Sequence, residues 1–196
     1  GVLVVLNDDI NAARDVTKTD ALRLDTFRTR GYGVLGYVDH DRITYYRNVI
    51  RKHTSESEFD GAQLTAPMPR VDVIWVYQGA RADLIKAAVD LGAKGIVMAT
   101  AGAGATSGDQ EDGMAYALKK GVIVVITTRT GSGRIAPRNG PRRPPTQGPY
   151  AGLTEAELAR MIAGEDLAPV KARILLMLAL TKTHDPAAIQ QMFEEY

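Results

Sequence analysis

The chain has 196 residues, of which 45% are hydrophobic, and a formal net charge of +1 at pH 7. Its length fits one large or two small soluble domains with packed cores, and its charge gives no general case for nucleic-acid binding. The absence of cysteine excludes disulfides, a thiolate nucleophile and Cys-ligated zinc. No stretch approaches the roughly 20 apolar residues that span a bilayer, and composition does not distinguish a cytoplasmic from a periplasmic location.

Residues 2–6 form an apolar run of Val and Leu. Such a run predicts a strand covered on both faces, as in a central parallel strand, so residue 1 is expected to lie inside a domain. The polar stretch at residues 7–19 is expected where this strand passes into a loop. Open α/β sheets hold their functional residues in loops of this kind.

Residues 34–38 and 42–50 flank the short polar segment Asp-His-Asp at 39–41, which predicts a β-hairpin. From residue 52 to about residue 69 the chain is polar and ends in Pro-Met-Pro, as expected of a linker. The resulting domain prediction has three parts: residues 1–60 as the end of a larger α/β N-terminal domain, residues 61–69 as a linker, and residues 70–196 as a C-terminal α/β domain.

The segment after the linker alternates between apolar runs and helical patterns. Strands are predicted at 71–77, 95–99 and 122–127, and helices at 82–91 and near 110–120. Alternation of this kind predicts βαβ units with right-handed crossovers, and hence a small flavodoxin-like parallel sheet with helices on both faces. Asp109 is expected to cap the second helix, and Gly92 and Gly121 to end the two helices.

The last third of the chain begins with residues 131–152, which are rich in Pro, Gly and Arg and are expected to form a mobile surface loop. Residues 161–163 predict a short fourth strand. A helix starting at Pro169 is apolar most of the way round, so it is expected to be buried. Asp185 is expected to cap a final helix over residues 187–195.

Residues 1–19 end in the motif Asp-Val-Thr-Lys-Thr at 15–19. Together with six later blocks in the same order, residues 1–19 resemble the second half of bacterial-type L-asparaginases, and several blocks in order are more specific than one short motif. The six blocks lie at residues 24–27, 33–37, 51–54, 92–97, 119–122 and 171–181. The resemblance implies an amidohydrolase that converts L-asparagine, or L-glutamine, to the acid and ammonia.

Lys18 is the one catalytic residue that the resemblance implies within this chain. In the family, the Lys of this motif belongs to a Thr-Lys-Asp group that assists an attacking Thr hydroxyl, a weak nucleophile that needs a nearby base or cation. The alternative is an exposed loop lysine, or one paired with Asp15. The family's nucleophilic Thr precedes this motif, so we expect the chain by itself to be inactive and to depend on an upstream segment, such as a separate N-terminal polypeptide.

Residues 100–108 form a small-residue loop with the spacing G-x-G-x-x-x-G between a predicted strand and a predicted helix. One interpretation is an anion or dinucleotide site, and the other is a tight connection that requires small residues. In the asparaginases this loop carries Asn side chains, one of which reaches a neighbouring subunit's active site. The matching positions here are Ala103 and Ala105, so the substrate-binding residues and the preference between asparagine and glutamine stay open.

The basic loop contains four arginines and no acidic residue between positions 131 and 150. The arginines, which would attract carboxylates or nucleic acid or simply be solvated, are Arg134, Arg138, Arg142 and Arg143.

The three histidines, at positions 40, 53 and 184, have no ligand spacing, so neither a metal nor another cofactor is expected. The resemblance implies a homo-oligomer, a dimer or tetramer, that acts on a small amide without nucleic-acid or membrane partners. The alternative function is a non-catalytic ligand-binding or oligomerisation module.

Overall fold

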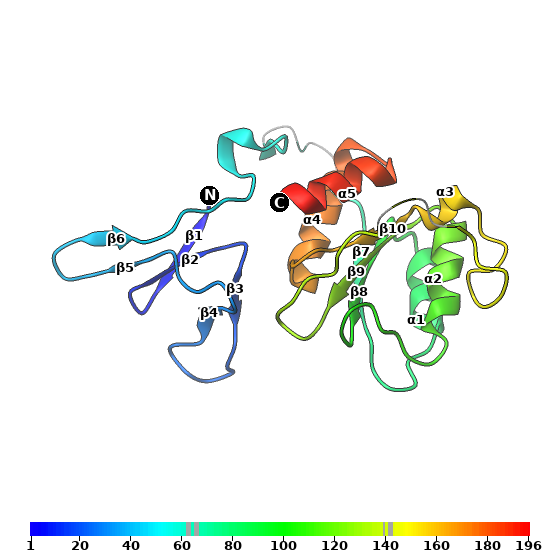
Figure 1. Ribbon diagram of the computed structural model, residues 1–196, viewed down its shortest axis with the longest axis horizontal. Helices are drawn as coiled ribbons and strands as arrows, with labels where there is room; N and C mark the ends of the chain where they lie inside the picture. Colours follow the sequence, from blue (N-terminus) through cyan, green and yellow to red (C-terminus); the bar gives the residue numbers. More distant parts are fainter. Residues whose placement is uncertain (62–63, 65–66, 139, 141–142) are drawn as a thin grey trace. The chain divides into compact units, whose positions relative to one another are not determined.

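The computed structural model describes residues 1–61, 64, 67–138, 140 and 143–196. The chain divides into two compact units, Gly1–Glu58 together with Tyr196, and Phe59–Glu195. Antiparallel strands make up the first unit, and a parallel sheet with helices makes up the second, which confirms the mixed α/β class (Figure 1). The linker predicted at residues 61–69 stays a prediction, and residues 62–63 and 65–66 lie outside the described residues.

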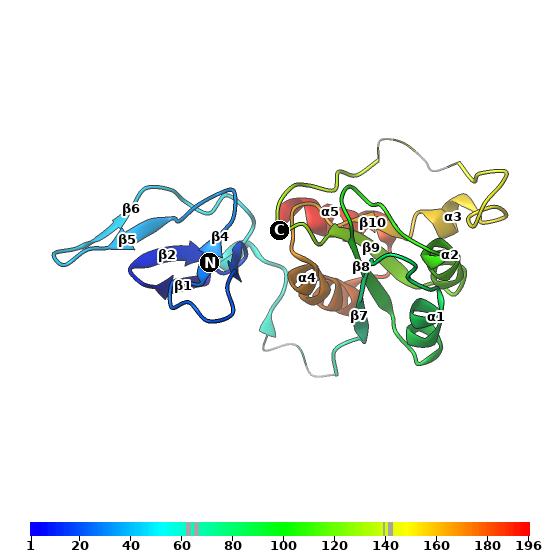
Figure 2. The ribbon, with the colours of Figure 1, turned by 90° about the horizontal axis from the view of Figure 1, so that it is seen from below.

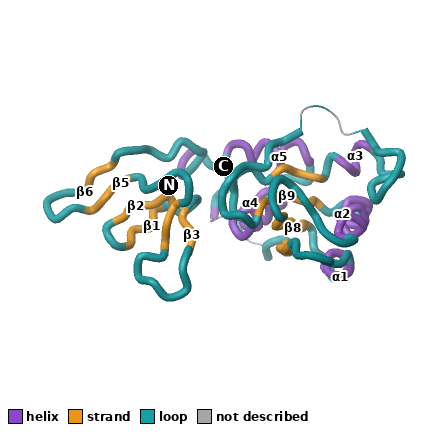
Figure 3. The backbone as a smooth tube through the Cα atoms, turned by 60° about the horizontal axis from the view of Figure 1, so that its bottom comes forward, coloured by secondary structure: helices purple, strands orange, loops and turns teal. Residues whose placement is uncertain are grey.

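Unit 1 contains short strands joined by turns and loops (Figure 3). Its four-stranded antiparallel sheet has the order β1-β2-β5-β6, and a two-stranded antiparallel sheet joins β3 to β4. The strands are β1 (Leu3–Leu6), β2 (Asp9–Ala12), β3 (Val16–Lys18), β4 (Phe27–Thr29), β5 (Gly36–Val38) and β6 (Ile43–Tyr45). The pairing of β5 with β6 confirms the predicted hairpin.

The prediction of a covered parallel strand at residues 2–6 is wrong for the structure described here. β1 pairs antiparallel with β2 at the end of its sheet, and Val5 is 54% exposed. The reason is the turn that follows: Asn7 and Asp8 both adopt positive φ, 49° and 64°, as a two-residue hairpin turn requires. The polar stretch 7–19 is therefore a tight turn followed by β2 and β3 rather than a loop.

Unit 2 is built on a four-stranded parallel sheet with the order β10-β9-β8-β7. Helices α1 and α2 lie on one side of this sheet and α4 and α5 on the other (Figures 1 and 2). The strands are β7 (Val71–Trp75), β8 (Gly95–Thr100), β9 (Ile123–Thr128) and β10 (Met161–Ala163). The helices are α1 (Asp83–Asp90), α2 (Gln110–Lys119), α3 (Glu155–Leu158), α4 (Pro169–Lys182) and α5 (Pro186–Glu195). These elements confirm the predicted parallel sheet with helices on both faces.

The core of unit 2 is centred on β8, of which every residue is buried. On α4, Ala172 and Leu176 are fully buried against the sheet side, whereas Val170 and Ile174 are 61% and 49% exposed. The prediction that this helix is buried therefore holds for the face that carries Ala172 and Leu176, whereas positions 170 and 174 share a face, one turn apart, that points away from the core. No helix in the described part of the chain is long and apolar enough to cross a membrane.

The helix ends show which caps depend on local sequence. Asp185 accepts hydrogen bonds from the backbone N–H groups of Ala187 and Ala188 at 3.3 and 3.2 Å, as predicted for the start of α5. Asp109 makes no such cap on α2, because its carboxylate accepts from the N–H of Ala82 at 2.7 Å instead. Gly92 and Gly121 adopt positive φ at the ends of α1 and α2, as predicted.

Candidate functional site

Lys18 ends β3 and lies opposite Phe27 of β4. Val16, at the start of this strand, is buried, whereas Lys18, at its end, is exposed. Its ammonium group makes no hydrogen bond or ion pair with any residue that the structure describes. The nearby Asp15 pairs with Arg14 at 2.8 Å, so the structure leaves the amine of Lys18 accessible to an added group.

The turn that connects β3 to β4 is held by a dense set of hydrogen bonds. The N–H and the hydroxyl of Thr19 both donate to the carbonyl of Thr26 at 2.8 Å, and the Thr26 hydroxyl accepts from the N–H of Asp20. Asp20 in turn accepts from the N–H groups of Arg23 and Leu22, which lower the pKa of its carboxyl group. These bonds fix the backbone directly after Lys18.

Asn11 of β2 supports the same two-stranded sheet and was missed by the sequence analysis. Its side chain is fully buried, and its Oδ1 accepts a hydrogen bond from the hydroxyl of Thr29 on β4 at 2.8 Å. Its Nδ2 has no hydrogen-bond partner among the described residues. The one sequence signal that could have identified Asn11 is a polar residue between two apolar ones, Ile10 and Ala12, all three of which are buried.

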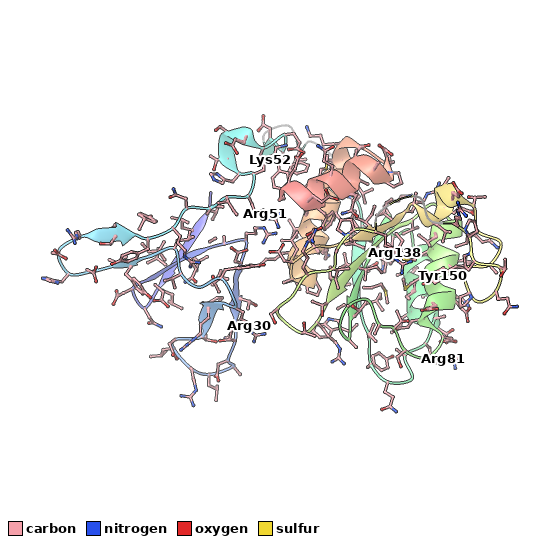
Figure 4. The ribbon with its side chains drawn as sticks, viewed as in Figure 1. Arg30, Arg51, Lys52, Arg81, Arg138 and Tyr150 are labelled. Carbon is pink, nitrogen blue, oxygen red and sulfur yellow. The ribbon has the colours of Figure 1, made fainter. Side chains whose placement is uncertain are left out.

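Tyr196 packs into unit 1 beside Lys52, which Figure 4 labels. The Lys52 ammonium lies 2.9 Å from Glu58 and 5.5 Å from the centroid of the Tyr196 ring. The Tyr196 hydroxyl donates to Glu58 and lies 2.6 Å from the Ser57 hydroxyl, while Arg14 donates to the Tyr196 carbonyl. Burial raises the pKa of Glu58, but the hydrogen bonds from Tyr196 and Lys52 outweigh burial and bring that pKa below its usual value.

The loop after β8 makes the contacts of a tight connection. The Thr100 hydroxyl donates to the Thr127 carbonyl at 2.6 Å and accepts from the N–H of Gly104 at 3.2 Å. Gly108 has a φ of +57°, and a Cβ atom there would lie 2.2 Å from the carbonyl oxygen of Ala80. These contacts account for the glycine at position 108.

Neither alanine of this loop offers a polar side chain. Ala103 and Ala105 are both exposed, and the carbonyl of Ala105 accepts from the N–H of Ala101 at 3.2 Å. Ala103 also borders a cavity of about 670 Å³ in unit 2. Any polar contact that these two positions make with a ligand must therefore come from their backbone.

Several residues of the basic loop, residues 131–150, also line this cavity. Arg134 makes a two-pronged ion pair with Glu165, a residue only 2% exposed, and this contact raises the pKa of Arg134. Arg134 therefore attracts a carboxylate of the chain itself, while its side chain stays 57% exposed. Arg138 and Arg143 are exposed at the cavity border, and Arg142 lies outside the described residues.

Glu165 was also missed by the sequence analysis. It lies 31 positions from Arg134, and its backbone pairs with Ile135 in an isolated antiparallel bridge. No local pattern links residues so far apart. Within the described ranges, no three His, Cys, Asp or Glu side chains are grouped so as to hold a metal ion.

Solved structures contain the same fold. The chain superposes on a probable cytoplasmic L-asparaginase from Campylobacter jejuni with a TM-score of 0.86 and 40% sequence identity, over all of this chain and 59% of that one. The fold is thus that of an L-asparaginase. The chain belongs to the asparaginase/glutaminase family, since the family's C-terminal domain matches residues 70–193 and its N-terminal asparaginase domain matches residues 1–51.

Curated relatives match the whole chain. L-asparaginase 2 of Bacillus subtilis is 45% identical and L-asparaginase 2 of Escherichia coli is 40% identical, with 48% and 52% of those proteins covered. The glutaminase-asparaginase of Pseudomonas fluorescens is 32% identical over 50% of its length. The chain therefore spans about half the length of the curated relatives that it matches.

Proposed function

We propose that this chain serves in an L-asparaginase-type amidohydrolase, which converts an amino-acid amide and water to the acid and ammonia. The observation that carries the proposal is the match to both family domains in order along one chain, at residues 1–51 and 70–193. The names of the relatives, which include L-asparaginase 2 and glutaminase-asparaginase, support L-asparagine as substrate and L-glutamine as a second one.

Lys18 is the catalytic residue that we assign to this chain. A Thr hydroxyl attacks the amide carbon, the C–N bond breaks with release of ammonia, and water then hydrolyses the acyl ester to the acid. A hydroxyl is a weak nucleophile at neutral pH, so a lysine beside it assists by accepting its proton or by stabilising its alkoxide. The exposed amine of Lys18, on a strand with a firmly hydrogen-bonded turn behind it, is suited to this contact.

The nucleophilic Thr belongs, in our proposal, to a segment outside these 196 residues. Half of each relative's length has no counterpart here, which leaves room for such a segment. We therefore propose that the chain by itself releases no ammonia from asparagine. We also propose that the active protein is a homo-oligomer, because the family resemblance implies active sites shared between subunits.

A chimera tests the proposed activity. The matched 48% of Bacillus subtilis L-asparaginase 2 is replaced by residues 1–196, and ammonia release is measured with L-asparagine, with L-glutamine and without substrate. The 196-residue chain alone is the matched control. We expect the chimera to hydrolyse asparagine and the chain alone to be inactive. A folded chimera that releases no ammonia from either amide would refute the proposed function.

A further inference from the structure

The cavity in unit 2 has a lining that is partly apolar and partly polar. It has a volume of about 670 Å³, within the range of about 300–1,000 Å³ that is usual for small-molecule sites. Its apolar lining comes from α2, β9, α3 and β10, through the residues Met114, Ile126, Leu158, Met161 and Ile162. Such a lining suits an apolar body rather than a highly hydrated ion.

The border of the cavity is positively charged. Arg134, Arg138 and Arg143 all line it, and the charge of Arg134 is neutralised by the buried Glu165. Arg138 and Arg143 make no hydrogen bond or ion pair with any residue in the described part of the chain. Two guanidinium groups are thus available to a ligand at one side of the cavity.

Glu111 is the acidic side chain of the lining and lies at the start of α2. Its carboxylate accepts a hydrogen bond from the Thr106 hydroxyl at 3.2 Å. Repulsion from Glu111 directs a negative group away from α2 and toward the segment that carries Arg138 and Arg143. Figure 4 labels Arg138 and Tyr150, two of the residues that line the cavity.

We propose that this cavity binds a monocarboxylate with an apolar body, such as an aryl-substituted or branched-chain carboxylic acid. The apolar part occupies the space lined by Met114, Ile126 and Ile162. The carboxylate accepts hydrogen bonds from Arg138 and Arg143, because guanidinium groups match carboxylate geometry. The site goes beyond the proposed amidohydrolase activity and does not depend on it.

Calorimetric titration of the full chain with 3-phenylpropionate tests the proposal. The uncharged 3-phenylpropanamide and inorganic phosphate are titrated in parallel, so that the apolar body and the charge are each tested alone. The expected result is saturable binding of one 3-phenylpropionate, with both comparison compounds at least about tenfold weaker. The absence of saturable binding, or equal binding of either comparison compound, would overturn the proposal.

Variants locate the binding. The double change Arg138→Gln and Arg143→Gln is expected to weaken 3-phenylpropionate binding at least about tenfold. The matched control changes Arg30 and Arg42 to Gln, two exposed arginines of unit 1, and alters the net charge equally. Ala136→Trp adds bulk at the cavity border and is expected to abolish binding while both arginines remain. The assignment of the binding site would be contradicted if the Arg138 and Arg143 variant or Ala136→Trp bound 3-phenylpropionate with unchanged affinity. An equal loss of affinity in the control would also contradict it.

Discussion

At Gly108, the backbone of the loop after β8 closely approaches the backbone of the loop at Ala80. The φ of Gly108, +57°, lies in the left-handed region, and its Cα faces the carbonyl group of Ala80. An alanine at this position would meet both a conformational penalty and a clash. Gly121 provides the comparison, because it also has a positive φ, +80°, but has no atom within 4 Å of an added Cβ.

We predict that Gly108→Ala destabilises the protein by about 2–4 kcal/mol, whereas Gly121→Ala costs about 1–2 kcal/mol. The difference is the overlap with the carbonyl oxygen of Ala80, 2.2 Å from the added Cβ. Urea unfolding of the two variants measures both values. Equal destabilisation by the two substitutions would show that the loop after β8 can move away from Ala80.

Tyr196 gives a second prediction, which concerns pH. Because the folded-state pKa of Glu58 is lowered, its contribution to stability is present above the unfolded pKa of about 4.5 and is lost as the pH falls through the folded value. Tyr196→Phe removes one of the hydrogen bonds that lower this pKa. We expect the variant to be about 1 kcal/mol less stable at pH 7.

The stability difference between Tyr196→Phe and the unmodified chain should shrink below pH 4.5, where Glu58 becomes protonated. Thermal unfolding at pH 7 and at pH 3 compares the two proteins. Tyr45→Phe serves as control, because the hydroxyl of Tyr45 makes no hydrogen bond to a carboxylate in the described part of the chain. A difference that grows at low pH would contradict the assigned role of Glu58.

Contacts between residues could be predicted from the sequence only where the partners are close together along the chain. The Asp185 cap could be predicted because its partners are two and three positions away. Arg134 and Glu165, 31 positions apart, could not be paired from any local pattern. The exposure of Lys18 could not be predicted either, because strand alternation puts Lys18 on the same face as Val16, which is buried.

At the scale of elements, the acidic residues beside α2 and α5 differ in what they stabilise. Asp185 bonds to the first turn of α5, whereas Asp109 bonds to Ala82 ahead of α1. The two positions look alike in sequence, since each precedes a helix. The contact that Asp109 makes depends on α1 and α2 lying side by side on one face of the sheet.

We predict that Asp185→Ala costs about 0.5–2 kcal/mol and increases amide hydrogen exchange at Ala187 and Ala188. Asp109→Ala is expected to increase exchange at Ala82, whose N–H it holds at 2.7 Å, and to leave the first turn of α2 unchanged. Hydrogen exchange followed by NMR resolves these amides. Faster exchange at the start of α2 in the Asp109 variant would restore the helix-cap interpretation.

Element-level prediction succeeded where the hydrophobic pattern was decisive. In unit 2, each strand and helix predicted from the alternating pattern has a counterpart in the structure. In unit 1, the apolar run at residues 2–6 was assigned to a parallel strand because periodicity alone does not give strand direction. The tight turn at Asn7 and Asp8 decides that direction, and it was not recognised as a hairpin turn.

At the scale of the whole molecule, the two units differ in how much core they contain. The main hydrophobic cluster lies entirely in unit 2, with all its buried members between Val76 and Leu158. In unit 1, Val2 and Val5 are 77% and 54% exposed. The apolar surface of unit 1 is therefore less completely covered within this chain.

We predict that residues 66–196 made alone are soluble and unfold cooperatively, whereas the 196-residue chain is less soluble because of the exposed β1. Size-exclusion chromatography and chemical denaturation of the two polypeptides measure both properties. The matched variant Val5→Thr keeps a β-branched side chain on β1 and should improve the solubility of the longer chain. A longer chain that is monodisperse and as soluble as residues 66–196 would contradict this prediction.

The catalytic role of Lys18 is tested by ammonia release from L-asparagine by the chimera in which Lys18 is changed to Met. The control is Lys94→Met, which removes an exposed lysine of unit 2 just before β8. We predict that Lys18→Met lowers kcat by about 10²-fold or more, whereas the control retains full activity. A Lys18→Met chimera as active as the control would contradict the central claim that this chain supplies the catalytic lysine.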